Sequence, residues 1–462
     1  MTHEYQKKVL ETLGTISESD NVEVYAVGGY IRDTILGRST SEIDFMVLGD
    51  GPSFAALAAK KMGGRGLVTF PRFGTAHFEV DDLKLEFVSA RQESYEESSR
   101  NPAVIESDFK SDIERRDFTV NTLASRVTSR GLDSVIDLYN GQKDLQKKII
   151  RTPLDPETTF CDDPLRIMRA ARFASQLDFS IEARTLEAME TQKERLRIIS
   201  QERITEEFFK ILSHEKPSVG LNILYDTGVL RIIFPELAAL KGVEQIERYH
   251  HKDVFDHTLK VVDNLAGVTD NPNLLFTGLV HDIGKPRVKR FVEGTGWTFH
   301  GHEMVGTHML SSICVRLKLS NAMCRYAKKL TRLHMRPVNL VSSEVTDSAV
   351  RRLIVHAGED LEDLLTLCRA DITSGNPARV KRHLANFDYV AERVADVTEK
   401  DKLRAFQSPV RGDEIMAVCN IAPGPGVGKL KKAIEEAILD GEIPNEHDAA
   451  LEYLLKIKDF VL

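Results

Sequence analysis

The chain of 462 residues has few cysteines and no long hydrophobic segment. Its five cysteines are scattered, and no two of them form a Cys-x-x-Cys pair. This spacing argues against a disulfide framework or a zinc ribbon and is typical of a reducing compartment. No apolar run approaches the roughly 18 residues that a membrane-spanning helix needs, and the polar N-terminus does not resemble a signal peptide. We therefore expect a cytoplasmic protein without a membrane partner.

An excess of positive charge is also absent. The chain has 62 lysines and arginines against 70 aspartates and glutamates, which gives a net charge of −8. A protein that coats nucleic acid is normally basic, so any polyanionic partner must be held by local patches rather than by the overall field. Internal repeats and low-complexity tracts are absent too.

The hydrophobic pattern divides the chain into a mixed part and a helical part. Residues 22–27 and 43–48 are typical of buried strands, and two apolar stretches around Asp81 and Asp82 predict a hairpin. Beyond Pro156 the pattern is helical to the C-terminus. We expect an α+β fold with four parts, which are a head, a neck, a helical domain and a helical tail; their ranges are 1–152, 153–240, 241–395 and 396–462.

Two carboxylates mark the start of the second strand. In "SEIDFMV", Glu42 and Asp44 are two residues apart and share one face of a strand. Like charges this close repel each other unless a cation lies between them. A metal site and a solvated strand end both remain open from this pair alone.

A glycine turn precedes the carboxylates. Gly28 and Gly29 stand between a buried strand and a helix, where the backbone can approach a phosphate closely. Arg32 and Asp33 follow directly. Triphosphate chemistry needs these parts together, because backbone and arginine donors bind phosphates while carboxylates bind Mg²⁺.

Five motifs in order resemble the class II tRNA nucleotidyltransferase and poly(A) polymerase family of the polymerase β superfamily. The first is "VGGYIRDTILGRSTSEIDFMV", and the others lie at 115–124, 135–152, 162–177 and 201–212. The resemblance implies a polymerase-β-like head with a small mixed sheet, followed by an all-α neck and a helical body. It also implies an enzyme that transfers nucleotides to RNA 3′ ends.

The resemblance assigns roles to the residues of the head. Glu42 and Asp44 would bind the catalytic Mg²⁺, with Glu86 as the candidate third carboxylate. The family usually has Asp-x-Asp, and the longer glutamate either tunes the rate or disables the head, because Mg²⁺ demands near-octahedral geometry; we expect activity. The remaining nucleotide-binding residues implied by the motifs are Gly28, Gly29, Arg32, Asp33, Arg116 and Asp117.

The fourth motif implies that protein side chains select the incoming base. Asp163 would accept from the exocyclic amine of C or A, and Arg166 would donate to ring acceptors, a pattern that neither G nor U offers. Arg169 and Arg172 lie on the same helix face and would extend the nucleotide pocket. The alternative is a charged neck helix that is paired to acidic neighbours.

A second group of candidate ligands lies in the helical body. "LVHDIGKP" contains His281 and Asp282, and the order His…His-Asp…Asp resembles the HD phosphohydrolase superfamily. Imidazole and carboxylate ligands suit divalent transition metals, and Mg²⁺ is an alternative. The implied ligands are His257, His281, Asp282 and Asp371, with His302 and His334 at the positions of a second metal. The body is then either a metal-dependent phosphohydrolase or a scaffold for the tRNA body with idle ligands.

The expected function is template-independent addition of C and A from CTP and ATP to the 3′ end of tRNA, with release of pyrophosphate. The "TFPRFGTAHFEV" stretch favours tRNA over poly(A) synthesis, because bacterial poly(A) polymerases of this kind carry a basic "GRRF"-like signature there. Residues 91–112 occupy the flexible-loop region, and their length favours full CCA addition. CC-adding, A-adding and poly(A)-adding enzymes remain alternatives, as does an HD nucleotide hydrolase whose head is not catalytic.

Overall fold

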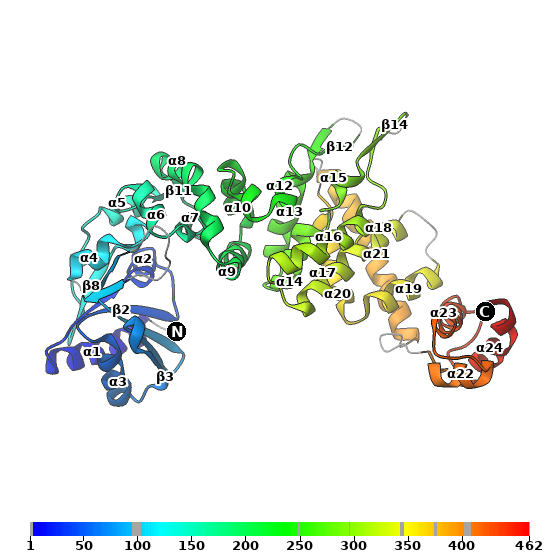
Figure 1. The fold of residues 1–462 in the computed structure, drawn as a ribbon, viewed down its shortest axis with the longest axis horizontal. Coiled ribbons are helices and arrows are strands. Elements are labelled where there is room, and N and C mark those ends of the chain that lie inside the picture. The colour runs from blue at the N-terminus through cyan, green and yellow to red at the C-terminus, as the bar shows by residue number, and fades with distance from the viewer. Residues whose placement is uncertain are drawn as a thin grey trace. The chain divides into compact units, whose positions relative to one another are not determined.

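The structure is a computed structural model that describes residues 3–94, 103–106, 108–247, 250–294, 296–341, 346–373, 377–401 and 408–461. Its contacts divide the chain into two compact units, Met1–Pro235 and Glu236–Leu462 (Figure 1). Among the described helices, none has both the length and the hydropathy that crossing a membrane would require.

The first unit is built on a seven-stranded mixed sheet in the order β3-β4-β5-β2-β1-β8-β9. The ladder between β2 and β5 is parallel and the other ladders are antiparallel. The predicted strands and the hairpin at Asp81 are therefore confirmed. The strands are β1 Glu23–Val27, β2 Glu42–Leu48, β3 Arg65–Phe70, β4 Thr75–Val80, β5 Leu83–Ser89, β8 Ala124–Thr128 and β9 Gly131–Leu132.

The two faces of strand β2 explain how the sheet can carry both a core and a site. Ile43 and Phe45 are fully buried on one face, where Phe45 stacks on Phe87 with ring centroids 5.0 Å apart. Helices α1 (His3–Ser19) and α3 (Gly51–Met62) pack against the sheet. Because strand side chains alternate, the residues between the buried ones face the other way. Glu42 and Asp44 are on that second face.

Several short elements complete the head. They are α2 Gly29–Ile35, the β6–β7 pair Arg91–Ser94 and Ala103–Glu106, α4 Phe109–Glu114, α5 Gly141–Lys147 and β10 Ile149–Ile150. The predicted flexible-loop region, 91–112, is described only in part, because 95–102 and 107 lie outside the described residues.

The neck helices are α6 Pro156–Asp162, α7 Leu165–Leu177, α8 Ala183–Gln192, α9 Gln201–Leu212, α10 Pro217–Asp226 and α11 Val229–Ile233. Helix α7 packs on α9 and α10, and it buries residues such as Ile167 and Ala171. The neck was predicted to be all-helical, but it also contains the two-residue strand β11, Ser180–Ile181, which pairs in parallel with β10. A ladder this short leaves no alternating pattern in the sequence.

The second unit is mainly helical, as predicted, and the α+β fold class is confirmed. Its body contains α12 Pro235–Ala238, α13 Val254–Ala266, α14 Pro272–Val280, α15 Lys285–Val288, α16 His302–Arg316, α17 Asn321–Leu333, α18 Met335–Val341, α19 Asp347–Ala357, α20 Leu361–Asp371 and α21 Pro377–Asp401. The tail helices α22 Gly412–Cys419, α23 Pro425–Leu439 and α24 His447–Val461 share a core of their own around Ile415, Leu430 and Leu454.

Two small hairpins interrupt the predicted helical run. They are formed by β12 Glu244–Glu247 with β13 His250–Asp253, and by β14 Arg290–Val292 with β15 Gly296–Thr298. The two hairpins are neighbours, because β12 contacts β15 (Figure 1). Strands of three or four residues are too short for a reliable period-two signal.

Candidate active site and metal centre

The structure brings the three predicted head carboxylates together. In the parallel ladder of β2 and β5, Asp44 is opposite Glu86 and Glu42 is opposite Lys84. One carboxylate oxygen from each of Glu42, Asp44 and Glu86 lies within 4.8 Å of the other two. Mg²⁺ and similar hard divalent cations bind carboxylate oxygens, so a cluster of three carboxylates fits such a cation.

Lys84 was not predicted as part of this site. Its Nζ lies 2.8 Å from Oε1 of Glu42 and also contacts Oε1 of Glu86. The signal was present in the sequence, because Lys84 is two residues from Glu86 and so shares its strand face. Burial, followed by the charges of Glu42 and Glu86, raises the pKa of Asp44 to about 6. The carboxylate cluster therefore favours a cation, and in this structure the ammonium group of Lys84 is that cation.

The glycine turn forms one wall of the cavity beside the carboxylates. Gly28 has a φ of 68°, and a Cβ added to it would lie 3.1 Å from Nη1 of Arg116. A side chain at this position would be strained and crowded, which explains why glycine stands here. The cavity has a volume of about 940 Å³, and Gly28, Gly29, Arg116 and the three carboxylates all line it.

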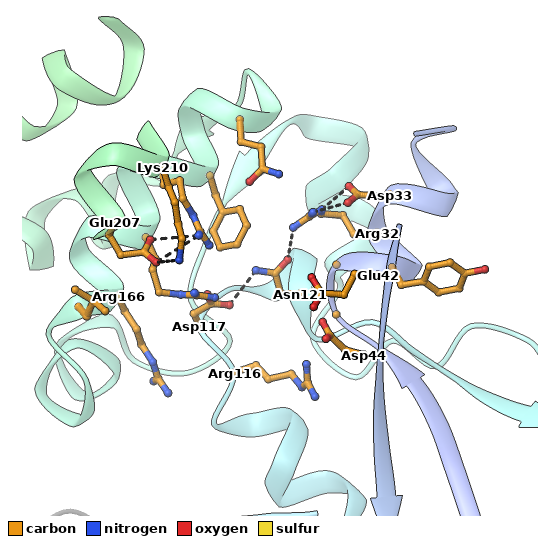
Figure 2. A pocket seen from close by; sticks show the side chains of 18 of the residues that line it. Arg32, Asp33, Glu42, Asp44, Arg116, Asp117, Asn121, Arg166, Glu207 and Lys210 are labelled. Carbon is orange, nitrogen blue, oxygen red and sulfur yellow. Dashed lines mark hydrogen bonds and ion pairs between the residues drawn. The ribbon is translucent and has the colours of Figure 1, made fainter. Parts of the chain in front are cut away.

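A chain of hydrogen bonds joins the first and second motifs (Figure 2). Arg32 donates from Nε and Nη2 to Asp33 at 2.9 and 2.7 Å and from Nη1 to Oδ1 of Asn121 at 2.7 Å. Asn121 then donates to Oδ1 of Asp117 at 2.9 Å, and Arg169 donates to Oδ2 of Asp117 at 2.8 and 2.5 Å. Three of the five N–H groups of Arg32 are therefore used in fixing its position.

The buried carboxylate of Asp117 is the centre of this chain. Burial raises its pKa, but the charge of Arg169 and the hydrogen bonds from Asn121 and Arg169 outweigh burial and hold the pKa at about 2. Asp117 is thus a charged hub that orients arginines. Asn121 was missed as a site residue, although it lies inside the quoted motif 115–124.

The predicted base-reading residues lie at the start of α7, and both line the cavity. Arg166 donates from Nη2 to the carbonyl of Arg115 at 2.5 Å and from Nη1 to the carbonyl of Thr159 at 3.3 Å. Asp163 has an oxygen 3.6 Å from Nη2 of Arg203. Backbone contacts therefore anchor Arg166. Arg203 also lines the cavity; it lies within the motif at 201–212, but the sequence did not identify it as a site residue.

The other arginines of α7 are paired with acids, as the alternative interpretation expected. Arg169 pairs with Asp117, and Nη1 of Arg172 lies 3.3 Å from Oε2 of Glu207. The guanidinium carbons of Arg32, Arg169 and Arg172 all lie 4.5 to 5.4 Å from the ring centroid of Phe173. These arginines still line the cavity, so pairing fixes their geometry without removing them from the site. Lys210 joins Glu207 from α9 (Figure 2).

All six predicted ligands of the second unit meet in one buried cluster. His257, His281 and Asp282 form one group of potential ligands, and Asp282, His302 and His334 form another, so Asp282 belongs to both. Asp371 joins the first group, with Oδ1 2.8 Å from Nε2 of His257 and 3.4 Å from Nε2 of His281.

Backbone carbonyls hold three of the four histidine rings in one tautomer. The Nδ1 atoms of His281, His302 and His334 donate to the carbonyls of Gly278, Phe299 and Thr331 at 2.7, 2.9 and 2.6 Å. The Nδ1 atom of His257 lies 2.8 Å from Oγ1 of Thr373. Each Nε2 therefore faces the cluster, which is how metal-ligating histidines are normally oriented.

The charges of the cluster favour a bound cation. Burial raises the pKa of Asp282, but His281 and Lys285 outweigh burial and hold that pKa well below its usual range. Nε2 of His281 is buried and has no hydrogen bond of normal geometry, although Asp282 is 3.2 Å away. Lys285 is an additional member, with Nζ 2.6 Å from Oδ2 of Asp282. An orphaned ring nitrogen beside two carboxylates fits a metal ligand set.

Comparison with known proteins agrees with this two-part organisation. Residues 24–151 match the "Poly A polymerase head domain" family, residues 178–241 match the "Probable RNA and SrmB- binding site of polymerase A" family, and residues 254–375 match the HD domain family. The fold and the two clusters thus define a protein with a nucleotidyltransferase-type head and an HD-type domain.

Full-length relatives define the family. The A-adding tRNA nucleotidyltransferase of Deinococcus radiodurans is 31% identical over 92% of this chain and 93% of its own. The Multifunctional CCA protein of Methylococcus capsulatus is 29% identical over 92% and 99%. A solved CCA-adding enzyme in apo form has the same fold, with a TM-score of 0.64, 22% identity, and coverage of 98% and 96%. The chain belongs to the tRNA nucleotidyltransferase family, which confirms the resemblance seen in the motifs.

Proposed function

We propose that this tRNA nucleotidyltransferase adds both C and A, and so builds or repairs the CCA end of tRNA. One cavity carries the proposal, because it contains the carboxylate cluster of β2 and β5 together with Asp163 and Arg166 of the neck. A single cavity with both parts can hold the triphosphate near the metal ligands and the base near its readers. Relatives named as multifunctional CCA proteins support this proposal, and relatives named as A-adding or CC-adding represent the alternatives.

The head residues have distinct roles in the proposed reaction. Glu42, Asp44 and Glu86 would hold Mg²⁺, which when bound activates the attacking 3′-hydroxyl and stabilises the leaving pyrophosphate. The backbone at Gly28 and Gly29 and the side chain of Arg116 would bind the triphosphate. Asp117 and Asn121 do not need to touch the nucleotide, because their role is to position Arg32 and Arg169.

Selection of the base follows from donor and acceptor patterns. A carboxylate at Asp163 accepts from the amino group of C or A and repels the carbonyl oxygen that U and G present at the same position. The carbonyls of Arg115 and Thr159 hold Arg166 from one side, which leaves other N–H groups of its guanidinium for the base. The two residues together favour CTP and ATP over UTP and GTP.

The direct test is extension of a tRNA that lacks its terminal CCA, with Mg²⁺ and with CTP alone, ATP alone or both. Addition of two C residues with CTP and completion with ATP would support the proposal. Addition of C without completion would indicate a CC-adding enzyme, and addition of A only to a CC end would indicate an A-adding enzyme. Long A tails would indicate a poly(A) polymerase. The Glu42→Gln variant is the control for metal-dependent chemistry.

A second activity is favoured by the cluster in the second unit. Two groups of ligands share Asp282, and the hydrogen bonds of the rings point their Nε2 atoms inward. We infer that this centre binds a divalent metal and hydrolyses phosphate esters or cyclic phosphates. Hydrolysis of a 2′,3′-cyclic phosphate with Mn²⁺, Ni²⁺ or Mg²⁺ should be lost in the His257→Ala variant. Hydrolysis by an enzyme that never extends tRNA would instead favour the alternative of a non-catalytic head.

A further inference from the structure

The β14–β15 hairpin carries an exposed phenylalanine and a half-buried tryptophan that the two proposed activities do not use. Phe291 and Trp297 are partners in the ladder of this hairpin, with ring centroids 5.4 Å apart and planes at 75°. Phe291 is 63% exposed, and the next residue, Val292, is exposed as well. Large aromatic side chains are usually buried, so an exposed phenylalanine packed against a half-buried tryptophan on a hairpin indicates a binding surface.

Basic residues lie close in sequence to this aromatic pair, and one of them contacts it. Nζ of Lys289 lies 4.4 Å from the ring centroid of Trp297, and both Arg287 and Arg290 are exposed. Between residues 286 and 298 the chain has three basic residues and a single acidic one, in a protein whose net charge is −8. The hairpin is thus a local basic patch of the kind that an acidic protein needs in order to hold a polyanion.

This combination favours single-stranded nucleic acid over other partners. Nucleobases stack on exposed aromatic rings while phosphates contact nearby cations, and stacking needs base faces that are not already covered. A duplex hides those faces inside its own stack and is recognised by shape instead. A partner that offers only carboxylates would gain from the cations but not from the rings.

We propose that Phe291, Trp297 and Lys289 form a stacking platform for the bases of single-stranded RNA, with Arg287 and Arg290 contacting its phosphates. The platform is defined by these five residues.

The platform is built into the segment that joins the metal ligands of the second unit. This segment runs from Asp282 and Lys285 through the hairpin to His302. The carbonyl of Phe299 accepts from Nδ1 of His302, and Nζ of Lys285 lies 5.7 Å from the Phe299 ring. An RNA end on the platform would therefore be bound by a segment that directly connects residues of both ligand groups. Binding itself does not depend on hydrolysis or on nucleotidyl transfer.

The chain provides its own probe, because Trp297 is its only tryptophan. The fluorescence of the full-length protein should be quenched saturably by a short single-stranded oligoribonucleotide that ends in CCA. The Phe291→Ala variant should bind about tenfold more weakly, as expected for the loss of one stacking contact. Arg290→Gln should make the affinity less dependent on salt by about one phosphate contact.

The matched control is Phe70→Ala, because Phe70 is also an exposed phenylalanine on a short strand, 46% exposed, but lies in the other unit. This variant should leave the quenching curve unchanged. Absence of saturable quenching, equal quenching by the same sequence in a duplex, or equal quenching by AMP would overturn the proposal. Unchanged affinity in both Phe291→Ala and Arg290→Gln would overturn it as well.

Discussion

The ammonium group of Lys84 lies 2.8 Å from Oε1 of Glu42 and also contacts Glu86, and these are two of the three proposed metal ligands of the head. The two residues are opposite each other in the parallel ladder of β2 and β5. This pairing concerns the one position of the motif at which this chain has a glutamate, Glu42, where the family usually has an aspartate. The longer side chain reaches both Lys84 and the carboxylate cluster, so Lys84 holds the carboxylates together until a metal competes for them.

Competition between Lys84 and the metal gives the first prediction. In the Lys84→Met variant the ammonium group no longer competes, so the Mg²⁺ concentration for half-maximal tRNA extension should fall severalfold. Lys61→Met is the matched control, because Lys61 forms a similar pair with Asp20 outside the cavity. A higher Mg²⁺ requirement in Lys84→Met would show instead that Lys84 organises the ligands for the metal.

The raised pKa of Asp44, about 6, predicts how the Mg²⁺ requirement depends on pH. Below pH 6 the carboxyl of Asp44 is protonated in the metal-free site, and Mg²⁺ must displace that proton. The Mg²⁺ concentration for half-maximal activity should therefore rise about tenfold for each pH unit below 6 and stay constant above it. Excess Mg²⁺ should restore activity at low pH. A constant requirement down to pH 5 would contradict this assignment.

Base selection should change in the Asp163→Asn variant, because the carboxylate only accepts hydrogen bonds whereas the amide can also donate them. The amide of Asp163→Asn can donate to the carbonyl oxygen of U, which the carboxylate repels. The ratio of kcat/KM for UTP to that for CTP should therefore rise at least about tenfold, which corresponds to a change of about 1.4 kcal/mol. Glu206→Gln is the control, since Glu206 also lines the cavity but pairs with Lys210. An unchanged ratio in Asp163→Asn would remove this residue from base reading.

Asp117 should matter for stability as well as for activity. Its pKa falls from 3.8 to about 2 on folding, so its charged form contributes about 2 kcal/mol at neutral pH. This contribution is complete above pH 4 and is lost as the pH falls toward 2. Asp117→Asn should lower the free energy of unfolding by at least that amount, measured by urea titration with circular dichroism, because it also leaves Arg169 without its partner. A change under about 0.5 kcal/mol would show that the hub is not stabilising.

The shared position of Asp282 predicts the metal content of variants. Asp282 contributes to both ligand groups, so Asp282→Asn should lose all metal bound in the second unit. His302→Ala should lose only the metal of its own group and keep the one held by His257 and His281. Metal content after reconstitution with Mn²⁺ or Ni²⁺, measured by mass spectrometry, checks both. Full retention of metal by Asp282→Asn would contradict the shared-ligand arrangement.

The sequence was sufficient for the parts of the fold that have strong local patterns. The buried strands at 22–27 and 43–48 and the arginine face of α7 follow from periodicity, and the candidate ligands follow from ordered motifs. In the structure, the six predicted ligands of the second unit meet although His257 and Asp371 are more than a hundred residues apart. The order of the ligand motifs along the chain predicted that these residues meet, which hydrophobic periodicity could not do.

The missed features depend on contacts between distant segments. Lys84 shares a strand face with Glu86, but only the register of β2 and β5 places it opposite Glu42. Asn121 became a link only because Arg32 and Asp117 lie on either side of it. The hairpin with Phe291 was missed because its strands have three residues each. Such features are set by tertiary packing and leave little trace in the local sequence.

The most direct test of the central claim uses a tRNA that ends before CCA, together with all four nucleoside triphosphates and Mg²⁺. The 3′ ends of the products are then sequenced. The expected products end in CCA, with no incorporation of U or G and no further extension, and the Glu42→Gln variant should lose all extension. Products without added nucleotides, or tails of repeated A, would contradict it.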